Sequence, residues 1–265
     1  MAVSLVKMSR FLFEFEDLPW FPDKIKGSMT DYLRYFLKAT NFYGPIIPLI
    51  CEAMIESHQN SIIDLCSGSG GPIEDVMKGL KEIGNNSITV TLTDKFPNLN
   101  AFKLLQDKYP GQLSFMPASI DAKEVPGDLK GFRTIFSGIH HFHEKSIGDI
   151  IKNAVQSKAA IGIFDGGDRN IFTALGIILL QPISFLLFTP FFRPFRFSRL
   201  IFTYLIPIIP FCTVWDGVVS IIRLYSPKQL EQIAKTNDDG NYIWKSGKVK
   251  NKLGMNVAYL IGIPS

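Results

Sequence analysis

One stretch decides the fold: Ile62-Ile63-Asp64-Leu65-Cys66-Ser67-Gly68-Ser69-Gly70-Gly71-Pro72. An apolar run, typical of a buried strand, ends in an acid and passes into a turn of small residues. Gly68 and Gly70 permit a tight turn, and without Cβ atoms they let a ligand approach the backbone. A helix beginning near Pro72 would point its unpaired N–H groups at that ligand. The stretch therefore predicts a strand–turn–helix unit with a ligand at the turn.

A second apolar run, Val90-Thr91-Leu92-Thr93, ends in Asp94. An acid at this place in a βαβ unit can accept hydrogen bonds from both hydroxyls of a ribose. The full G-x-G-x-x-G spacing is absent and no basic residue follows the turn, so a ligand without phosphates is favoured over a pyrophosphate. Turn, helix and acid together predict a site for an adenosine-containing cofactor.

This combination resembles the class I S-adenosylmethionine-dependent methyltransferases, whose first motif is an acid followed by a G-x-G turn. Asp64, Gly68 and Gly70 match it, while Cys66 stands where the family usually has another glycine. The resemblance covers roughly residues 44–165 and 224–265. The alternative interpretation is an ordinary glycine-rich turn in another α/β protein.

Strand and helix patterns alternate from Ser61 onward, which predicts a parallel sheet. Strands are expected at 61–65, 88–93, 113–116, 132–136 and 159–164, followed by a helix at 227–235 and two strands at 242–245 and 256–263. The expected fold class is α/β, with a doubly wound, Rossmann-like, mostly parallel seven-stranded sheet and an antiparallel C-terminal hairpin.

Three domains or segments are expected. Residues 1–57 form an aromatic, helical cap in which Thr30-Asp31 begins a helix. Residues 58–165 and 225–265 form the cofactor-binding core, and 166–224 form a hydrophobic helical insertion.

The insertion carries no charged side chain over 170–192 or 200–215, and Arg193, Arg196 and Arg199 lie between these runs. The first run is long enough to span a bilayer. However, prolines at 182, 190, 207 and 210 are expected to break both runs, and a double crossing would leave the arginines on the far side, against the positive-inside rule. A monotopic hairpin whose arginines reach lipid phosphates is therefore preferred.

Two alternatives for the insertion stay open, a true membrane span and a soluble lid or homodimer surface. Asp216 and Arg223 flank the apolar run that follows. A buried pair below the lid is preferred for them, and contact with a polar head group is the alternative.

Composition bounds the environment. The net charge of +4 does not argue for nucleic acid, and neither a basic stripe nor an Asn-Pro-Pro-Tyr motif is present. Three scattered cysteines favour a reducing compartment. Met1–Arg10 lacks a signal-peptide layout. A cytoplasmic protein, peripheral at the inner face of the membrane, is expected.

The resemblance implies roles for individual residues. Asp94 would bind the ribose, Asp121 the adenine amine, and Asp64 the amino-acid end of S-adenosylmethionine, directly or through the glycine-rich turn. The alternatives are a capping aspartate at the strand end for Asp94, a plain turn aspartate for Asp121 and a solvated lysine for Lys95. The implied cofactor site comprises Asp64, Cys66, Gly68, Ser69, Gly70, Asp94, Lys95, Ser119, Ile120, Asp121, Ser137 and Gly138.

Three of the chain's four histidines follow the strand at 132–136. The resemblance places them beside the transferring methyl group, where His140 or His141 could remove a proton from the acceptor. The alternative is that they support the loop, because an activated sulfonium needs positioning more than a base. No metal is expected, since no cysteine or carboxylate stands at ligand spacing.

These features predict methyl transfer from S-adenosylmethionine to a hydrophobic or lipid-like small molecule at the membrane surface. One alternative is a soluble small-molecule methyltransferase whose insertion forms a lid or dimer interface. The other is a non-catalytic, membrane-tethered protein that binds S-adenosylmethionine.

Overall fold

The computed structural model describes residues 12–85 and 87–265. It contains two compact units. The helical unit is Met1–Ala39 with Gly167–Leu224, and the sheet unit is Thr40–Gly166 with Tyr225–Ser265. The expectation for Met1–Arg10 lies outside the described residues.

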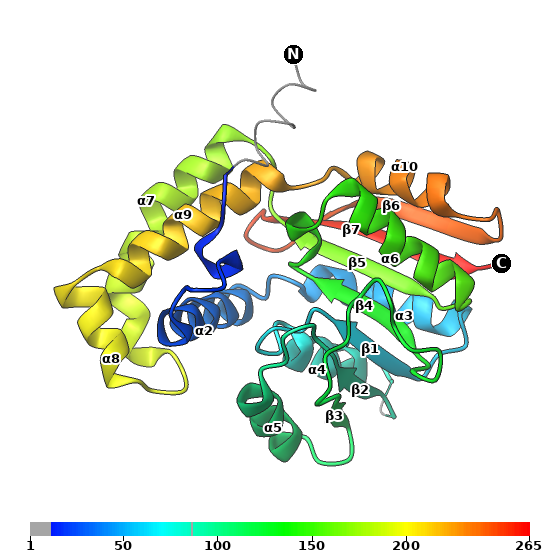
Figure 1. Cartoon of the computed structure of the whole chain (residues 1–265), viewed down its shortest axis with the longest axis horizontal. Helices are drawn as coiled ribbons and strands as arrows, with labels where there is room; N and C mark the ends of the chain where they lie inside the picture. Colours follow the sequence, from blue (N-terminus) through cyan, green and yellow to red (C-terminus); the bar gives the residue numbers. More distant parts are fainter. Residues whose placement is uncertain (1–11, 86) are drawn as a thin grey trace. The chain divides into compact units, whose positions relative to one another are not determined.

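The sheet unit holds, within its described part, a seven-stranded sheet in the order β3-β2-β1-β4-β5-β7-β6 (Figure 1). Its strands are β1 (Ser61–Leu65), β2 (Thr89–Leu92), β3 (Leu113–Phe115), β4 (Phe132–Phe136), β5 (Ile161–Gly166), β6 (Tyr242–Lys250) and β7 (Asn256–Pro264). Strands β1 to β5 pair in parallel, whereas β7 runs antiparallel to β5 and to β6. The predicted fold class is confirmed.

The described sheet unit has five α-helices: α3 (Ile47–Glu56) precedes β1, while α4 (Ile73–Glu82), α5 (Leu99–Lys108), α6 (Glu144–Gln156) and α10 (Pro227–Asn237) lie between strands in the sequence. Helix α4 buries an apolar stripe at helical spacing and is followed by Gly84 at φ +103°. Helix α10 begins with a capping box between Ser226 and Gln229. These local signals agree with the tertiary structure.

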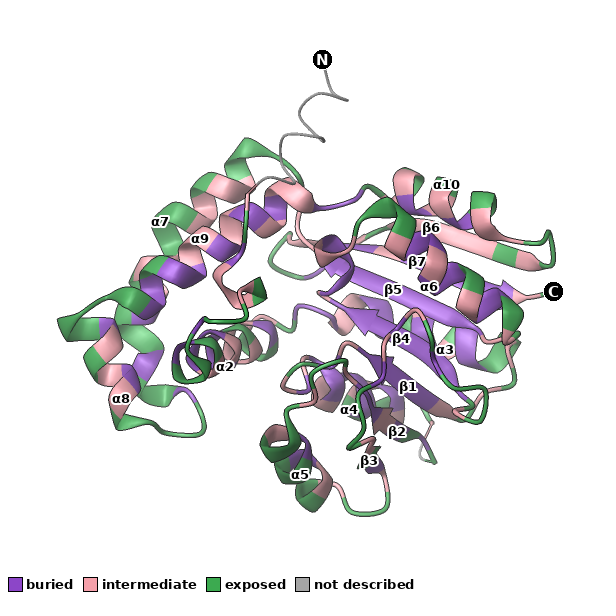
Figure 2. Cartoon of the chain, in the orientation of Figure 1, coloured by how far each residue is buried: buried purple, intermediate pink, exposed green. Residues whose placement is uncertain are grey.

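The core of the sheet unit lies between the central strands and helices α6 and α10. Ile135 of β4 and Ile163 of β5 are fully buried, and they belong to one cluster with Ile147 of α6 and Leu230 of α10. All five residues of β4 are buried (Figure 2), as expected for a central parallel strand covered on both faces. This packing fixes the carboxyl ends of β1, β2 and β4 side by side.

The helical unit contains α2 (Asp23–Ala39), α7 (Ile171–Phe188), α8 (Phe197–Leu200) and α9 (Ile208–Arg223). Short 3₁₀ turns cover Phe15–Asp17 and Thr189–Phe191, and a π-helical segment covers Ile201–Leu205. Its core joins the chain's N-terminal part to the insertion. Aromatic and aliphatic residues of α2 and the turn before it pack on residues of α7, α9 and the segment between them: Phe21, Ile25, Met29, Tyr32, Phe185, Phe192, Ile209 and Cys212.

Three local expectations for this unit are wrong. Helix α2 begins at Asp23, so Thr30-Asp31 lies inside it; Asp31 is buried there because Arg199, distant in sequence, pairs with it. Helix α7 continues through Pro182, because tertiary packing holds it on both sides of the proline. Before the proline, Ile177 lies against Gly217 of α9, and after it the ring of Phe185 stacks on that of Tyr32 (centroids 4.1 Å apart).

The third wrong expectation is a buried pair between Asp216 and Arg223, which do not pair with each other. Asp216 accepts the backbone N–H groups of Phe15 (2.7 Å) and Glu16 (3.2 Å). Arg223 pairs instead with Glu14 and Asp17, both at 3.0 Å. The N-terminal segment supplies partners that local sequence spacing could not reveal.

Candidate functional site

The turn after β1 has a backbone suited to small residues. Cys66, Gly68 and Gly70 have φ values of 57°, 56° and 94°, in the left-handed region. Ser67 N–H donates to the carbonyl of Thr93 (3.0 Å), and Gly70 N–H donates to the carbonyl of Ser67 (2.7 Å). The turn is therefore held tightly and tied to the end of β2.

Asp94 links this turn to β2 directly. One carboxylate oxygen accepts the N–H of Gly68 (2.8 Å) and the other accepts the N–H of Phe96 (2.8 Å). A carboxylate oxygen can accept a second hydrogen bond. Asp94 is half-buried, so both oxygens are held in place while remaining able to meet a ligand.

The segment after β3 lies against the same residues. Ile120 N–H donates to the carbonyl of Asp94 (2.9 Å), and Ser119 Oγ donates to the carbonyl of Lys95 (2.7 Å). Lys95 Nζ pairs with Asp121 at 2.9 Å. Burial of Asp121 opposes ionisation, but the Lys123 backbone N–H and the Lys95 ammonium outweigh it and lower the pKa of Asp121.

Asp64 is the most deeply buried acid of the turn, at 3% exposure. Thr134 Oγ1 of β4 donates to its carboxyl group at 2.7 Å. Burial raises the pKa of Asp64 to about 7, although hydrogen bonds from Ser67 and Thr134 oppose the rise. The group therefore changes charge near neutral pH. Burial also raises the pKa of the Cys66 thiol, which stays protonated.

The end of β4 approaches this turn at Gly138. A Cβ built on Gly138 would lie 3.6 Å from the Cβ of Cys66. Ser137 has φ 48°, and its Oγ lies 2.5 Å from the hydroxyl of Tyr43. The ring of Tyr43 packs edge-on against Phe136, which stacks on Phe164 of β5. An aromatic wall of Tyr43, Phe136 and Phe164 thus backs the loop after β4.

His140 and Asp165 form a buried pair beyond this wall. His140 Nδ1 lies 2.8 Å from Asp165 Oδ2, and the other Asp165 oxygen accepts the N–H of Gly166 (3.0 Å). When Nδ1 carries its proton toward Asp165, Nε2 is the basic nitrogen of the ring. The His141 ring lies beside that of His140, with centroids 4.3 Å apart.

The structure thus brings the twelve expected cofactor residues to neighbouring strand ends of the sheet unit, with His140 at the end of β4. Sequence reasoning missed Asp165. Its signal was an acid at the end of an apolar strand, the same signal that identified Asp64 and Asp94. Thr134 carried no local signal, since only the parallel register of β1 and β4 pairs it with Asp64.

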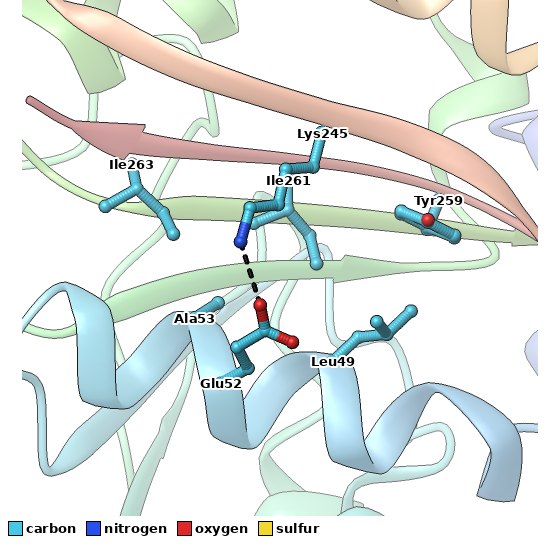
Figure 3. Close-up of a pocket in the computed structure, with 7 residues that line it drawn as sticks. All are labelled: Leu49, Glu52, Ala53, Lys245, Tyr259, Ile261 and Ile263. Atoms are coloured by element: carbon cyan, nitrogen blue, oxygen red, sulfur yellow. Dashed lines mark hydrogen bonds and ion pairs between the residues drawn. The ribbon is translucent and has the colours of Figure 1, made fainter.

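A separate hollow of the sheet unit lies elsewhere, over α3, β6 and β7 (Figure 3). It is lined by Leu49, Glu52, Ala53, Lys245, Tyr259, Ile261 and Ile263. Lys245 bridges its edge to Glu52 at 2.9 Å. The hollow shares no residue with the strand-end site.

Comparison with known proteins places the fold. No family model and no curated protein sequence matches the chain. Among solved structures, the plantazolicin methyltransferase BpumL in complex with SAH superposes with a TM-score of 0.57 at 14% identity, covering 92% of each chain. Human N-acetylserotonin methyltransferase in complex with SAM superposes at 0.51 and 9% identity, covering 99% of this chain and 65% of that one.

The pyocyanin biosynthetic protein PhzM also matches, at 12% identity and a TM-score of 0.48. The match covers 85% of this chain but 56% of PhzM, so the chain spans about half the length of that protein. From the two better superpositions, the chain has the class I S-adenosylmethionine-dependent methyltransferase fold.

Proposed function

We propose that the chain is an S-adenosylmethionine-dependent methyltransferase acting on a hydrophobic or lipid-like small molecule at a membrane surface. The observation that carries the cofactor part is the bond from Gly68 N–H to Asp94. It fixes a ribose-binding acid against a turn whose backbone a ligand can approach.

The residues present suit this cofactor. A Cβ built on Gly68 or Gly71 would meet no atom within 4 Å, so the turn has open space at these two positions. A Cβ on Gly70 would clash with Leu105 Cδ1, so Gly70 makes room for this leucine and not, as expected, for a ligand. Asp94 would accept the ribose hydroxyls, and Asp121 would accept from the adenine amine beside Ile120. Asp64 and the backbone at Ser137 and Gly138 would hold the amino-acid end, whose ammonium favours the charged form of Asp64.

When bound, the cofactor supplies a methyl group that leaves a sulfonium, whose sulfur keeps the electron pair of the broken bond. His140 Nε2 would take the proton of the acceptor hydroxyl or amine as that group bonds to the methyl carbon, and would later release it to water. Asp165 would hold His140 in the tautomer that leaves Nε2 basic. The aromatic wall would exclude water from the reacting atoms.

The helical unit supports the membrane part. Ile171–Phe191 is long and apolar enough to cross a bilayer, and only 11% of its most apolar window is buried within the protein. Its outer face exposes large apolar side chains, with Phe172 at 80% and Leu180 at 67% (Figure 2). Monomeric soluble proteins rarely expose so extended an apolar surface, which marks an interaction site.

In-plane binding suits this unit better than spanning. The second apolar run bends by 78° between Phe197–Leu205 and Ile208–Arg223, so it is not a straight span. Helix α9 also packs against α7 and α2 and carries buried Asp216. One face of the unit would therefore enter a leaflet, on the cytoplasmic side, while α9 stays within the protein.

A radiochemical assay tests this function. The whole protein is incubated with S-adenosylmethionine labelled in its methyl group and with vesicles made from a total lipid extract. Label should enter an organic-extractable product with wild type and with Asp107→Ala, an exposed acid on α5, but not with Asp94→Ala. Absence of label from any extract and from a panel of lipophilic alcohols, phenols and amines would reject the proposed acceptor class.

A further inference from the structure

Four arginines gather at one end of the helical unit around a single buried acid. Asp31 is paired with Arg199, with Arg34 at 3.2 Å and with Arg196 at 3.4 Å. Arg34 also donates to the backbone carbonyl of Arg193 at 2.5 Å. Among the described contacts, Asp31 is the one carboxylate that pairs with these arginines, so the cluster carries net positive charge.

The arginines divide into a structural one and three accessible ones. The Arg199 side chain is 1% exposed. It pairs with Asp31 and donates to the carbonyl of Phe192 inside the unit, so its charge is neutralised there and does not reach the surface. The Arg196 and Arg34 side chains are 41% and 25% exposed, and Arg193 is exposed. The expectation that Arg199 reaches lipid phosphates is therefore wrong, and Arg34 takes its place among the accessible cations.

Exposed aromatic rings alternate with these cations. The segment Arg193-Pro194-Phe195-Arg196-Phe197 is exposed at every position, with Phe195 at 55% and Phe197 at 70%. Phe191 before it is 62% exposed, and the last turn of α7 exposes Leu186 and Leu187. Cations beside exposed rings, continuous with an apolar helix face, are the composition of segments that lie at the bilayer interface.

We propose that Arg34, Arg193 and Arg196 bind the phosphate groups of anionic phospholipids while Phe191, Phe195 and Phe197 enter the acyl region. This inference rests on the membrane association proposed above and adds its lipid selectivity. Guanidinium groups suit the task because each offers five N–H donors in a planar fork that matches phosphate oxygens. Arg34 and Arg196 are positioned by Asp31, so less side-chain freedom is lost when a phosphate binds.

The test is co-sedimentation of the whole protein with sucrose-loaded vesicles. One set is pure phosphatidylcholine and the other contains about one third phosphatidylglycerol. The test variant is Arg193→Gln/Arg196→Gln. The charge-matched control is Lys250→Gln/Lys252→Gln, exposed residues of the sheet unit.

Each arginine at an anionic surface contributes about fivefold in partition. The arginine variant should therefore bind anionic vesicles about tenfold or more weakly, and neutral vesicles like wild type, while the lysine control changes less than threefold. Equal losses in both variants, or none in the arginine variant, would overturn the proposal. Thermal melting checks folding, and Arg193→Gln alone, outside the Asp31 pairs, replaces the double variant if that one is unstable.

The outcomes separate this inference from the proposed function. Wild type that binds neutral and anionic vesicles equally keeps the membrane association and refutes the proposed selectivity for anionic phospholipids. Wild type that binds neither refutes both membrane statements, whereas methyl transfer is decided by the radiochemical assay alone.

Discussion

Strand β4 carries Arg133 and Thr134, whereas helix α7 carries no charged side chain, yet β4 is the buried segment and α7 the exposed one. Every residue of Phe132–Phe136 is buried, whereas Phe185 is the buried residue of Ile171–Phe188. Strand β4 is paired on both edges, by β1 and β5, and lies in the core cluster with α6. Helix α7 packs on α9 along one side and leaves its other side exposed.

This difference shows that a segment is buried only where other strands or helices pack against it on every side. In the sheet unit, neighbouring strands and helices cover the strands along their length, so the polar groups that could bind a ligand lie at the strand ends. In the helical unit the missing partners leave an apolar surface that a lipid leaflet could cover. The predictions below test whether these two surfaces have separate functions.

The largest effect is expected at His140. His140→Ala removes the proposed base and should lower kcat by about 10² to 10⁴-fold, the usual contribution of general base catalysis. Initial rates of methyl transfer under saturating cofactor measure it. His143→Ala, an exposed neighbour, is the control and should keep wild-type kcat. Unchanged kcat in His140→Ala would show that positioning alone carries the reaction and would assign the histidines to loop support.

The next effect is expected on the apolar face of α7. Leu179→Glu/Leu180→Glu should weaken partition onto vesicles about hundredfold or more, because burial of one leucine contributes about 1.5 to 3 kcal/mol. Vesicle flotation measures it. The matched control, Leu104→Glu/Leu253→Glu, changes similarly exposed leucines of the sheet unit and should partition like wild type. Undiminished vesicle binding by the α7 variant would exclude this face as the membrane contact.

A smaller effect concerns the pH dependence of folding. The folded-state pKa of Asp64 is raised to about 7 from 3.8. The folded protein therefore holds a proton that the unfolded chain has lost, so this contribution to stability is full below about pH 4 and is lost as pH rises through 7. Asp64→Asn should flatten the fall in unfolding free energy between about pH 4 and 7, by up to about 4 kcal/mol.

Urea unfolding at several pH values measures this change. Asp216 of the helical unit has its pKa raised to about 7 for the same reason, burial, and provides the matched comparison. S-adenosylmethionine should reduce the pH dependence due to Asp64 but not that due to Asp216. An Asp64→Asn curve parallel to wild type would contradict the assigned environment.

The smallest effect is expected at Lys95. Its ion pair with Asp121 is more than half exposed on the lysine side, and solvent screens such exposed pairs, so the pair adds little to the stability of the site. Lys95→Ala should therefore change the Kd for S-adenosylmethionine by less than about fivefold. A larger loss in calorimetry would mean that Lys95 contacts the cofactor itself.

The sheet and the tight turn after β1 could be predicted from the sequence because their signals are local. Asp64, Gly68 and Gly70 stand in one short stretch, and the alternation of strands and helices determines how such stretches assemble. Asp94 followed from the same pattern at the next strand.

The sequence did not predict contacts that join distant segments. The pairs His140–Asp165 and Asp64–Thr134 depend on which strands are neighbours, and Asp31–Arg199 joins residues 168 positions apart. Pro182 was misjudged for a related reason: Ile177 before it packs on Gly217 of α9 and Phe185 after it packs on Tyr32, and this tertiary packing outweighs the local cost of proline.

Calorimetric titration of S-adenosylmethionine tests the central claim most directly. Wild type and Asp94→Ala are titrated with and without anionic vesicles, and Asp107→Ala is the control. We expect micromolar binding to wild type with or without vesicles, and a loss of about hundredfold or more in Asp94→Ala, because the two proposed hydrogen bonds from the ribose to this charged group would contribute about 1.5 to 3 kcal/mol each. No binding to wild type under either condition, or equal binding to Asp94→Ala, would contradict it.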